Sequence, residues 1–252
     1  MVAAYALGSI NLRKVISLPD AQWTQGSEAG QARREFAASL EAAGARVFAA
    51  ADEPAERLEG LQYLGQLASA SLEMKLDKGD PAHPRFTDWM ADYRKFLGDS
   101  TDAIYHTAEL ASEYRYEISG NRQEAAYLGF MLYGRQLNGW NRAVANLSSE
   151  QLRFDAQGNF SIVVSKERPA GQRDWLPMED DVHMVMVRQY YHGREGAAES
   201  TFKIRNLDAP EFTPATDSEM AARLRSASGF FNDTVDGAIA LAQMFTDAPN
   251  TC

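Results

Sequence analysis

The stretch Val182-His-Met-Val-Met-Val-Arg-Gln-Tyr-Tyr-His192 decides the fold of this chain. It is a run of apolar, β-forming residues that ends in polar ones, and its composition predicts a strand over Val182–His192. Side chains alternate between the two faces of a strand. One face of this strand is therefore expected to carry Met184, Met186, Arg188, Tyr190 and His192.

Further short strands are expected on both sides of this segment, separated by turns such as Ser119-Gly-Asn and Asp155-Ala-Gln-Gly-Asn. They are Ile104–Leu110, Tyr114–Ile118, Ala126–Tyr133, Leu152–Phe154, Phe160–Ser165 and Thr201–Leu207. Strands that follow one another this closely, without helices between them, favour a mostly antiparallel sandwich or jelly roll.

Helices are expected at both ends of the chain. Over Glu28–Ala50, apolar residues recur at spacings of three and four, the stripe of an amphipathic helix. A second stripe, Leu58–Leu76, follows Pro54, which suits the first turn of a helix, and the two helices are expected to pack as a hairpin. Thr216-Asp-Ser-Glu219 has the form of a capping box and opens a helix that can kink or end near Gly229.

The sequence thus predicts an α+β fold: an antiparallel β-sandwich or jelly-roll-like core with an N-terminal helical hairpin and a C-terminal helix. Residues 1–100 form the helical region, 101–210 the β-rich core and 211–252 the C-terminal helix, all in one compact unit.

Charge and cysteine content narrow the classes of function. The formal charge is −10, which repels phosphate backbones and anionic lipids, so neither nucleic acid nor membrane is an expected partner. Cys252 is the only cysteine, which excludes an intrachain disulfide and a thiolate metal cage. The N-terminus has its positive charges after the apolar stretch, the reverse of a secretory signal, so a cytoplasmic location is expected.

A series of motifs follows the order of a known bacterial domain. They are Asp80-Pro-Ala-His-Pro-Arg-Phe86, Tyr93-Arg-Lys-Phe-Leu-Gly-Asp-Ser-Thr-Asp102, Ile104-Tyr-His-Thr-Ala-Glu-Leu110, Tyr114-Arg-Tyr-Glu-Ile-Ser-Gly120, Phe160-Ser-Ile-Val-Val-Ser165, Trp175-Leu-Pro177 and Val185-Met-Val-Arg-Gln-Tyr-Tyr191. Together they resemble the domain of unknown function 1214 (DUF1214) family. The resemblance implies a β-rich, jelly-roll-like domain with helical flanks and a role in breaking down small organic compounds. It implies no catalytic residue set, and this chain has Ser100-Thr-Asp102 where members commonly show Asn-Pro-Asp.

The polar end of the expected strand is the candidate site. Neighbours on one strand face are about 7 Å apart, close enough for Arg188, Tyr190 and His192 to contact one small ligand. Arginine can fork onto a carboxylate or sulfate, tyrosine can donate to a hydroxyl, and histidine can act as acid or base at neutral pH. Met184 and Met186 would supply apolar walls. The alternative is that Arg188 pairs with an acid and the tyrosines pack at a sheet edge.

Other aromatic and polar groups can extend this site. Tyr105 shares a strand face with Glu109 and lies opposite to His106, so Tyr105 would join Arg188 only if both face the same interior. A tyrosine ladder between strands is the alternative. Tyr127 alternates onto one face with Gly129, which removes bulk where a ligand can approach.

Three further features of the sequence bear on function. Trp140-Asn-Arg142 is either a mobile lid or a surface loop. Glu179-Asp-Asp181 suits a divalent cation by composition, but its place between Pro177 and a strand favours a solvated turn, and the histidines lack a metal-binding spacing, so no metal is predicted. Phosphate-loop, dinucleotide-binding and serine-hydrolase motifs are absent from the sequence, so no organic cofactor is predicted.

These features favour an enzyme that moves protons on a small, largely apolar compound bearing a hydroxyl or carbonyl, as a dehydratase, lyase or isomerase does. His192 would be the acid or base, Tyr190 and Tyr105 hydrogen-bond donors, and Arg188 the anchor, with Met184, Met186 and Tyr127 as walls. The alternative is a non-catalytic ligand-binding or homo-oligomeric assembly module, such as a homodimer that uses the same face as its interface.

Overall fold

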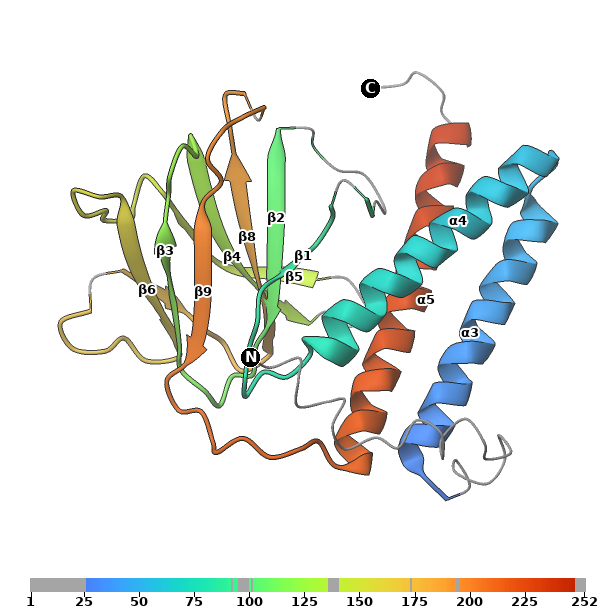
Figure 1. Cartoon of the computed structure of the whole chain (residues 1–252), viewed down its shortest axis with the longest axis horizontal. Helices are drawn as coiled ribbons and strands as arrows, with labels where there is room; N and C mark the ends of the chain where they lie inside the picture. Colours follow the sequence, from blue (N-terminus) through green and yellow to red (C-terminus); the bar gives the residue numbers. More distant parts are fainter. Residues whose placement is uncertain are drawn as a thin grey trace.

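The structure, a computed structural model, describes residues 26–91, 93–94, 100, 102–135, 141–172, 174–193 and 195–247. Two sheets form a sandwich, and a layer of helices stands beside it (Figure 1). The strands are β1 (Thr87–Asp88), β2 (Ala103–Glu109), β3 (Tyr116–Asn121), β4 (Tyr127–Arg135), β5 (Asn141–Ser148), β6 (Asn159–Ser165), β7 (Trp175–Pro177), β8 (Val182–Tyr190) and β9 (Thr201–Asn206). The predicted α+β sandwich with helical flanks is confirmed.

One sheet has the order β1-β2-β8-β4-β5 and the other the order β7-β6-β3-β9. Their neighbouring strands are antiparallel, apart from the short parallel pair of β6 with β7. Strand β8 lies at the centre of the first sheet, where its valines Val185 and Val187 point into the sandwich. Across the core they meet a second layer of apolar side chains, which includes Ile118, Phe160 and Ile162. Both faces of β8 are buried from Met184 to Val187, which explains why its apolar residues form a continuous run.

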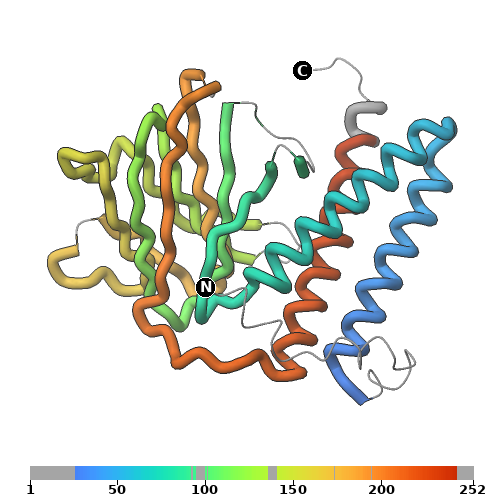
Figure 2. The backbone as a smooth tube through the Cα atoms, in the orientation of Figure 1, coloured from blue at the N-terminus to red at the C-terminus, as the bar shows by residue number. Residues whose placement is uncertain are grey.

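The helical layer joins the two ends of the chain. Helices α3 (Glu28–Ala50) and α4 (Pro54–Ser71) form the predicted hairpin, and α5 (Asp217–Asp247) packs against it (Figure 1). Phe36 of α3, Leu64 of α4 and Phe231 of α5 share one apolar core. In Figure 2 the chain after β9 runs below the sandwich to reach α5. The first and last helical regions of the sequence therefore build one layer.

The ends of α4 and α5 follow from local sequence. The α4 stripe continues as a π-helix, η1 (Leu72–Asp77), rather than as α-helix, and Leu58 at its start is exposed. The capping box of α5 is formed, since the hydroxyl and amide of Thr216 donate to Glu219 Oε2 at 2.8 and 2.7 Å and the Glu219 amide donates back at 3.2 Å. The α-helix continues through Gly229 instead of ending there.

Two strand predictions need correction. Leu152–Phe154 is not a strand but part of the turn after β5, although Leu152 is buried in the sandwich. Residues 141–148, which include Arg142 of the expected loop, form strand β5 instead. This strand is at the edge of its sheet and carries mixed polar residues, so its alternation is weak. Trp140 and Cys252 lie outside the described residues, as do residues 1–25.

No helix among the described residues has a stretch long and apolar enough to cross a bilayer. The helices instead pack on one another and on the sandwich.

Gly120→Ala is expected to lower the free energy of unfolding by about 2 kcal/mol. A methyl group at Gly120 of β3 would lie 1.9 Å from the carbonyl oxygen of Thr201, which is backbone and cannot move without separating β3 from β9. Urea unfolding followed by circular dichroism measures the change. Gly229→Ala is the matched control: a methyl group there meets nothing within 4 Å, and alanine favours helix, so that variant should be slightly more stable. Equal stability of the two variants would contradict the clash.

Candidate functional site

The strand register places most of the predicted site on the outer face of the five-stranded sheet, the face opposite to the sandwich core. Arg188 of β8 lies directly between Tyr105 of β2 and Gly129 of β4. Tyr190 is paired in the same way with Tyr127. Directly opposed residues of antiparallel strands project to the same side. The predicted convergence of Tyr105, Tyr127, Arg188 and Tyr190 on one face is therefore present in the register.

Arg188 is held between two phenol rings. Its guanidinium carbon lies 5.9 Å from the ring centre of Tyr105 and 5.9 Å from that of Tyr133, within the range of cation–π attraction. One N–H of the guanidinium also donates to the Tyr133 hydroxyl at 2.6 Å. Among the residues that the structure describes, no carboxylate lies within ion-pair distance of Arg188. The alternative in which Arg188 pairs with an acid therefore has no support in this part of the chain.

The methionines form an apolar floor under these groups. Met184 is 2% exposed and Met186 is 7% exposed, although both point away from the sandwich core. Met186 is paired with Thr107 on one side and Met131 on the other. Polar side chains thus lie above a floor from which water is largely excluded, the combination expected of a small-molecule site.

Gly129 has a structural role in this face. A methyl group there would lie 3.0 Å from the ring of Tyr127, so the absent side chain makes room for that ring. Tyr127 in turn packs edge-to-face on Tyr190, with ring centres 5.9 Å apart. The Tyr127 ring occupies the space at Gly129, and the two residues share a face because they are two positions apart in β4.

His192 lies beyond the end of β8. The strand stops at Tyr190, Tyr191 turns into the sandwich, and His192 is exposed in the following bend. The predicted strand Val182–His192 is therefore two residues too long, and strand alternation no longer places His192 on the face of Arg188. Tyr191 still follows the alternation, since it shares the inner face with Gln189 and its hydroxyl donates to Gln189 Oε1 at 2.5 Å.

A buried ion pair at the other end of the face was missed at the sequence level. Lys75 of η1 lies 2.5 Å from Glu109 of β2, and their side chains are 10% and 17% exposed. Glu109 occupies the same row of the sheet as Met184 and Tyr133. Only the strand alternation of Glu109 was visible in the sequence, because its partner comes from a helix that packs on the sheet through tertiary contacts.

His183 is kept neutral at this end of the face. Burial, followed by the charges of Lys75 and Arg135, lowers the pKa of His183 to about 4, while Asp181 opposes the shift. His183 is therefore neutral at pH 7, and its Nε2 lies 3.1 Å from Asn141 Oδ1. Since Lys75 is paired with Glu109 and Asp181 opposes Arg135, the charges at this end are nearly balanced.

The inner face of the same strands carries a hydrogen-bonded chain. Gln189 Oε1 accepts from Tyr191 Oη and from the Ser200 amide, at 2.5 and 3.2 Å. The Gln189 amide nitrogen must then donate to His106 Nε2, 2.7 Å away, so the His106 proton is on Nδ1, 2.9 Å from Asp88 Oδ1. This bond from His106, opposed by burial, lowers the pKa of Asp88. His106 thus lies on the face opposite to Tyr105, as predicted.

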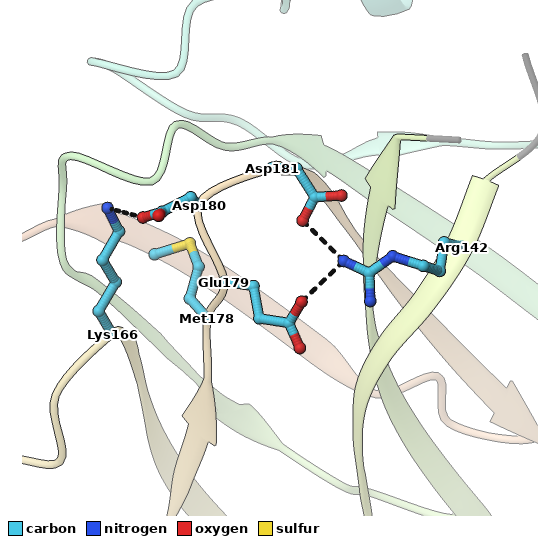
Figure 3. Close-up of a pocket in the computed structure, with 6 residues that line it drawn as sticks. All are labelled: Arg142, Lys166, Met178, Glu179, Asp180 and Asp181. Carbon is cyan, nitrogen blue, oxygen red and sulfur yellow. Dashed lines mark hydrogen bonds and ion pairs between the residues drawn. The ribbon is translucent and has the colours of Figure 1, made fainter. Parts of the chain in front are cut away.

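The acidic run before β8 is paired with two cations. Figure 3 shows Arg142 between Glu179 and Asp181, at 2.7 and 2.8 Å, and Lys166 paired with Asp180 at 2.5 Å. These groups and Met178 line a shallow hollow of about 590 Å³. Hydrogen bonds from Arg142 lower the pKa of Asp181 against a smaller effect of burial. Within the described part of the chain, no cluster of three or more potential ligands has metal-binding geometry.

Comparison with known proteins identifies the fold but assigns no activity. No family model matches the chain, and no curated protein is significantly similar to it in sequence. The crystal structure of an uncharacterized protein from Burkholderia cenocepacia is 27% identical to it over 87% of this chain, with a TM-score of 0.80. This chain spans 62% of the length of that protein. A protein of known structure from Vibrio parahaemolyticus matches 61% of this chain and 44% of its own, at 13% identity and a TM-score of 0.34.

Proposed function

We propose that the outer face of the five-stranded sheet binds a small, largely apolar molecule with a hydroxyl or carbonyl group and moves protons on it without an organic cofactor. The reaction class is that of a dehydratase, lyase or isomerase. The observation that carries the proposal is Arg188, held between two phenol rings above a methionine floor. Membership of the DUF1214 family is part of the same proposal, and its support is the motif series that ends at Tyr191.

The groups on this face suit such chemistry. A phenol can donate a proton to, or hydrogen-bond with, an oxygen of the ligand, which assigns this role to Tyr105 and Tyr190. The Arg188 guanidinium can stabilise negative charge that develops on that oxygen, and it is worth more on a half-buried face than in water. Met184 and Met186 support the apolar body of the ligand, and Tyr127 closes the end near Tyr190. His192 has no part in this arrangement, because β8 ends before it.

Arg188→Ala separates this proposal from an assembly role for the same face. If the face binds a small ligand, the variant should keep the oligomeric state of the wild type and lose ligand binding. Light scattering after size-exclusion chromatography reports the first, and saturation-transfer NMR with 2-hexanone, 1-hexanol and hexanoate reports the second. Binding of at least one probe to the wild type, weakened at least about tenfold in the variant, is the expected result.

Two outcomes would count against the proposal. Dissociation of an oligomer in Arg188→Ala would show that the face is a subunit interface, for instance of a homodimer. Absence of binding by all three probes to the wild type would remove the small-molecule site. Arg205→Ala is the control, because Arg205 is an exposed arginine of the other sheet and pairs with Glu117 at 2.7 Å.

A further inference from the structure

We infer that Arg188 is a carboxylate clamp oriented by Tyr133, and that the ligand is a monocarboxylate with an apolar body. This inference rests on the proposed function and names the class of molecule that the site takes. It adds Tyr133 to the site as a positioning residue, which orients Arg188 without contacting the ligand's reacting atoms.

The Arg188 guanidinium is a half-buried cation without a counter-charge among the described residues. Arg188 is half-buried, and its described contacts are a neutral hydroxyl and two aromatic rings. A cation removed from water is costly unless a counter-charge or several hydrogen bonds compensate for it. Arg94 shows the compensated case in the same protein, since it is bound by the carboxylate of Glu73. A ligand carboxylate would give Arg188 the counter-charge that the described residues do not supply.

The hydrogen bond to Tyr133 fixes the orientation of the Arg188 side chain. Tyr133 is four residues beyond Gly129, the β4 partner of Arg188, a distance of about 13 Å along the strand. Arg188 can reach the Tyr133 hydroxyl only if its side chain lies along the strand, over the row of Met186 and Met131. The guanidinium is then fixed above the apolar floor with N–H groups left to donate. A planar fork held in this way matches the two oxygens of a carboxylate.

The charges on the outer face determine which ligand charge fits. Lys75 is paired with Glu109 at 2.5 Å and is therefore neutralised. Among the described residues over the methionines, this leaves Arg188 as the cation without a counter-charge. One cation balances a monoanion. A dianion such as phosphate would retain a negative charge within the reach of the Glu109 carboxylate, which disfavours it.

The two methionines determine which ligand body fits. Met184 and Met186 lie beneath the guanidinium and are shielded from water. A ligand chain that packs beside them leaves water, and each methylene it buries should tighten binding about fourfold, from about 0.8 kcal/mol per buried group. Methionine is flexible enough to adapt to chains of different shape. The floor therefore selects for apolar length rather than for a single skeleton.

The test is a comparison of ligands with the same body and different heads. Hexanoate, hexanamide, 1-hexanol and inorganic phosphate are titrated into the 252-residue chain and followed by NMR. Hexanoate should bind at least about tenfold more tightly than hexanamide or 1-hexanol, and octanoate more tightly than hexanoate. Phosphate should not compete with hexanoate.

The variants locate the clamp. Arg188→Lys keeps the charge but loses the fork, and it should weaken hexanoate at least about fivefold while leaving 1-hexanol unchanged. Tyr133→Phe keeps the ring but removes the acceptor, so it should also weaken hexanoate selectively. A merely structural role of Tyr133 would weaken both ligands alike. Arg205→Ala should change neither affinity.

The outcomes distinguish this inference from the proposed function. Equal binding of hexanoate and 1-hexanol, both lost in Tyr105→Phe, would overturn the carboxylate clamp and leave the small-molecule site in place. Tighter binding of phosphate than of hexanoate would overturn the monoanion assignment. Absence of binding by every probe would overturn both.

Discussion

Glu73→Gln is expected to lower the free energy of unfolding by about 3 kcal/mol or more, because it removes the counter-charge of a buried arginine. The Arg94 side chain is 3% exposed and is bound by Glu73 Oε2, while its other terminal nitrogen donates to the Asp88 carbonyl at 2.8 Å. Arg94 Nε is buried without a hydrogen-bond partner among the described residues. The guanidinium therefore depends on Glu73, and an amide of the same shape cannot replace its charge. Urea unfolding at pH 7 measures the loss as a lower midpoint at an unchanged slope.

The same residue predicts how stability depends on pH. Burial alone would raise the pKa of Glu73, but hydrogen bonds from Lys78, Arg94 and Thr87 outweigh it and lower the pKa from 4.5 to about 2. A carboxyl whose pKa is lower in the folded state stabilises the fold above the unfolded value and loses that contribution as the pH falls through the folded value. The stability difference between wild type and Glu73→Gln should therefore be full above pH 4.5 and shrink towards pH 2.

An exposed ion pair provides the control. Arg115 and Asp208 lie 2.6 Å apart with side chains 57% and 33% exposed, and solvent screens such a pair. Asp208→Asn should cost less than about 1 kcal/mol. If Glu73→Gln costs no more than this control, Arg94 does not depend on its carboxylate partner.

The correctly predicted features are those that follow from the side-chain period of a strand or a helix. The alternation of β8 and β4 placed Arg188, Tyr190 and Tyr127 on one face, and the same rule put Tyr105 and His106 on opposite faces. Apolar spacing also predicted α3, because a helix that buries one stripe records its period in the sequence. These elements have one face in a core, so a shift by one residue would expose it.

Features that depend on tertiary contacts could not be predicted from the sequence. The edge strand β5 has little apolar alternation, and the ion pair of Lys75 with Glu109 joins residues 34 positions apart. The end of β8 at Tyr190 was not predicted either, because Tyr191 and His192 would continue the strand by composition. The Tyr191 side chain stays on the inner face, where its hydroxyl binds Gln189, and His192 lies in the exposed bend that follows.

Gln189→Leu is the second substitution with a large expected effect, about 3 kcal/mol of destabilisation. Gln189 is 0% exposed inside the sandwich, where its amide donates to His106 and accepts from Tyr191. Leucine fills a similar volume but leaves His106 Nε2 without its donor and the Tyr191 hydroxyl without its acceptor. Each orphaned buried group costs about 1 to 3 kcal/mol. Urea unfolding measures the loss.

Gln151→Leu is the matched control, because Gln151 is exposed and its side chain accepts one hydrogen bond, from the Ser148 amide at 2.9 Å. It should cost less than about 1 kcal/mol. Nitrogen chemical shifts of His106 in the wild type should show the proton on Nδ1, the arrangement that the Gln189 amide and Asp88 impose. Equal costs for the two leucine variants would mean that the buried chain from Asp88 to Tyr191 does not hold the end of β8. The site residues Arg188 and Tyr190, which flank Gln189, would then owe their placement to the sheet register alone.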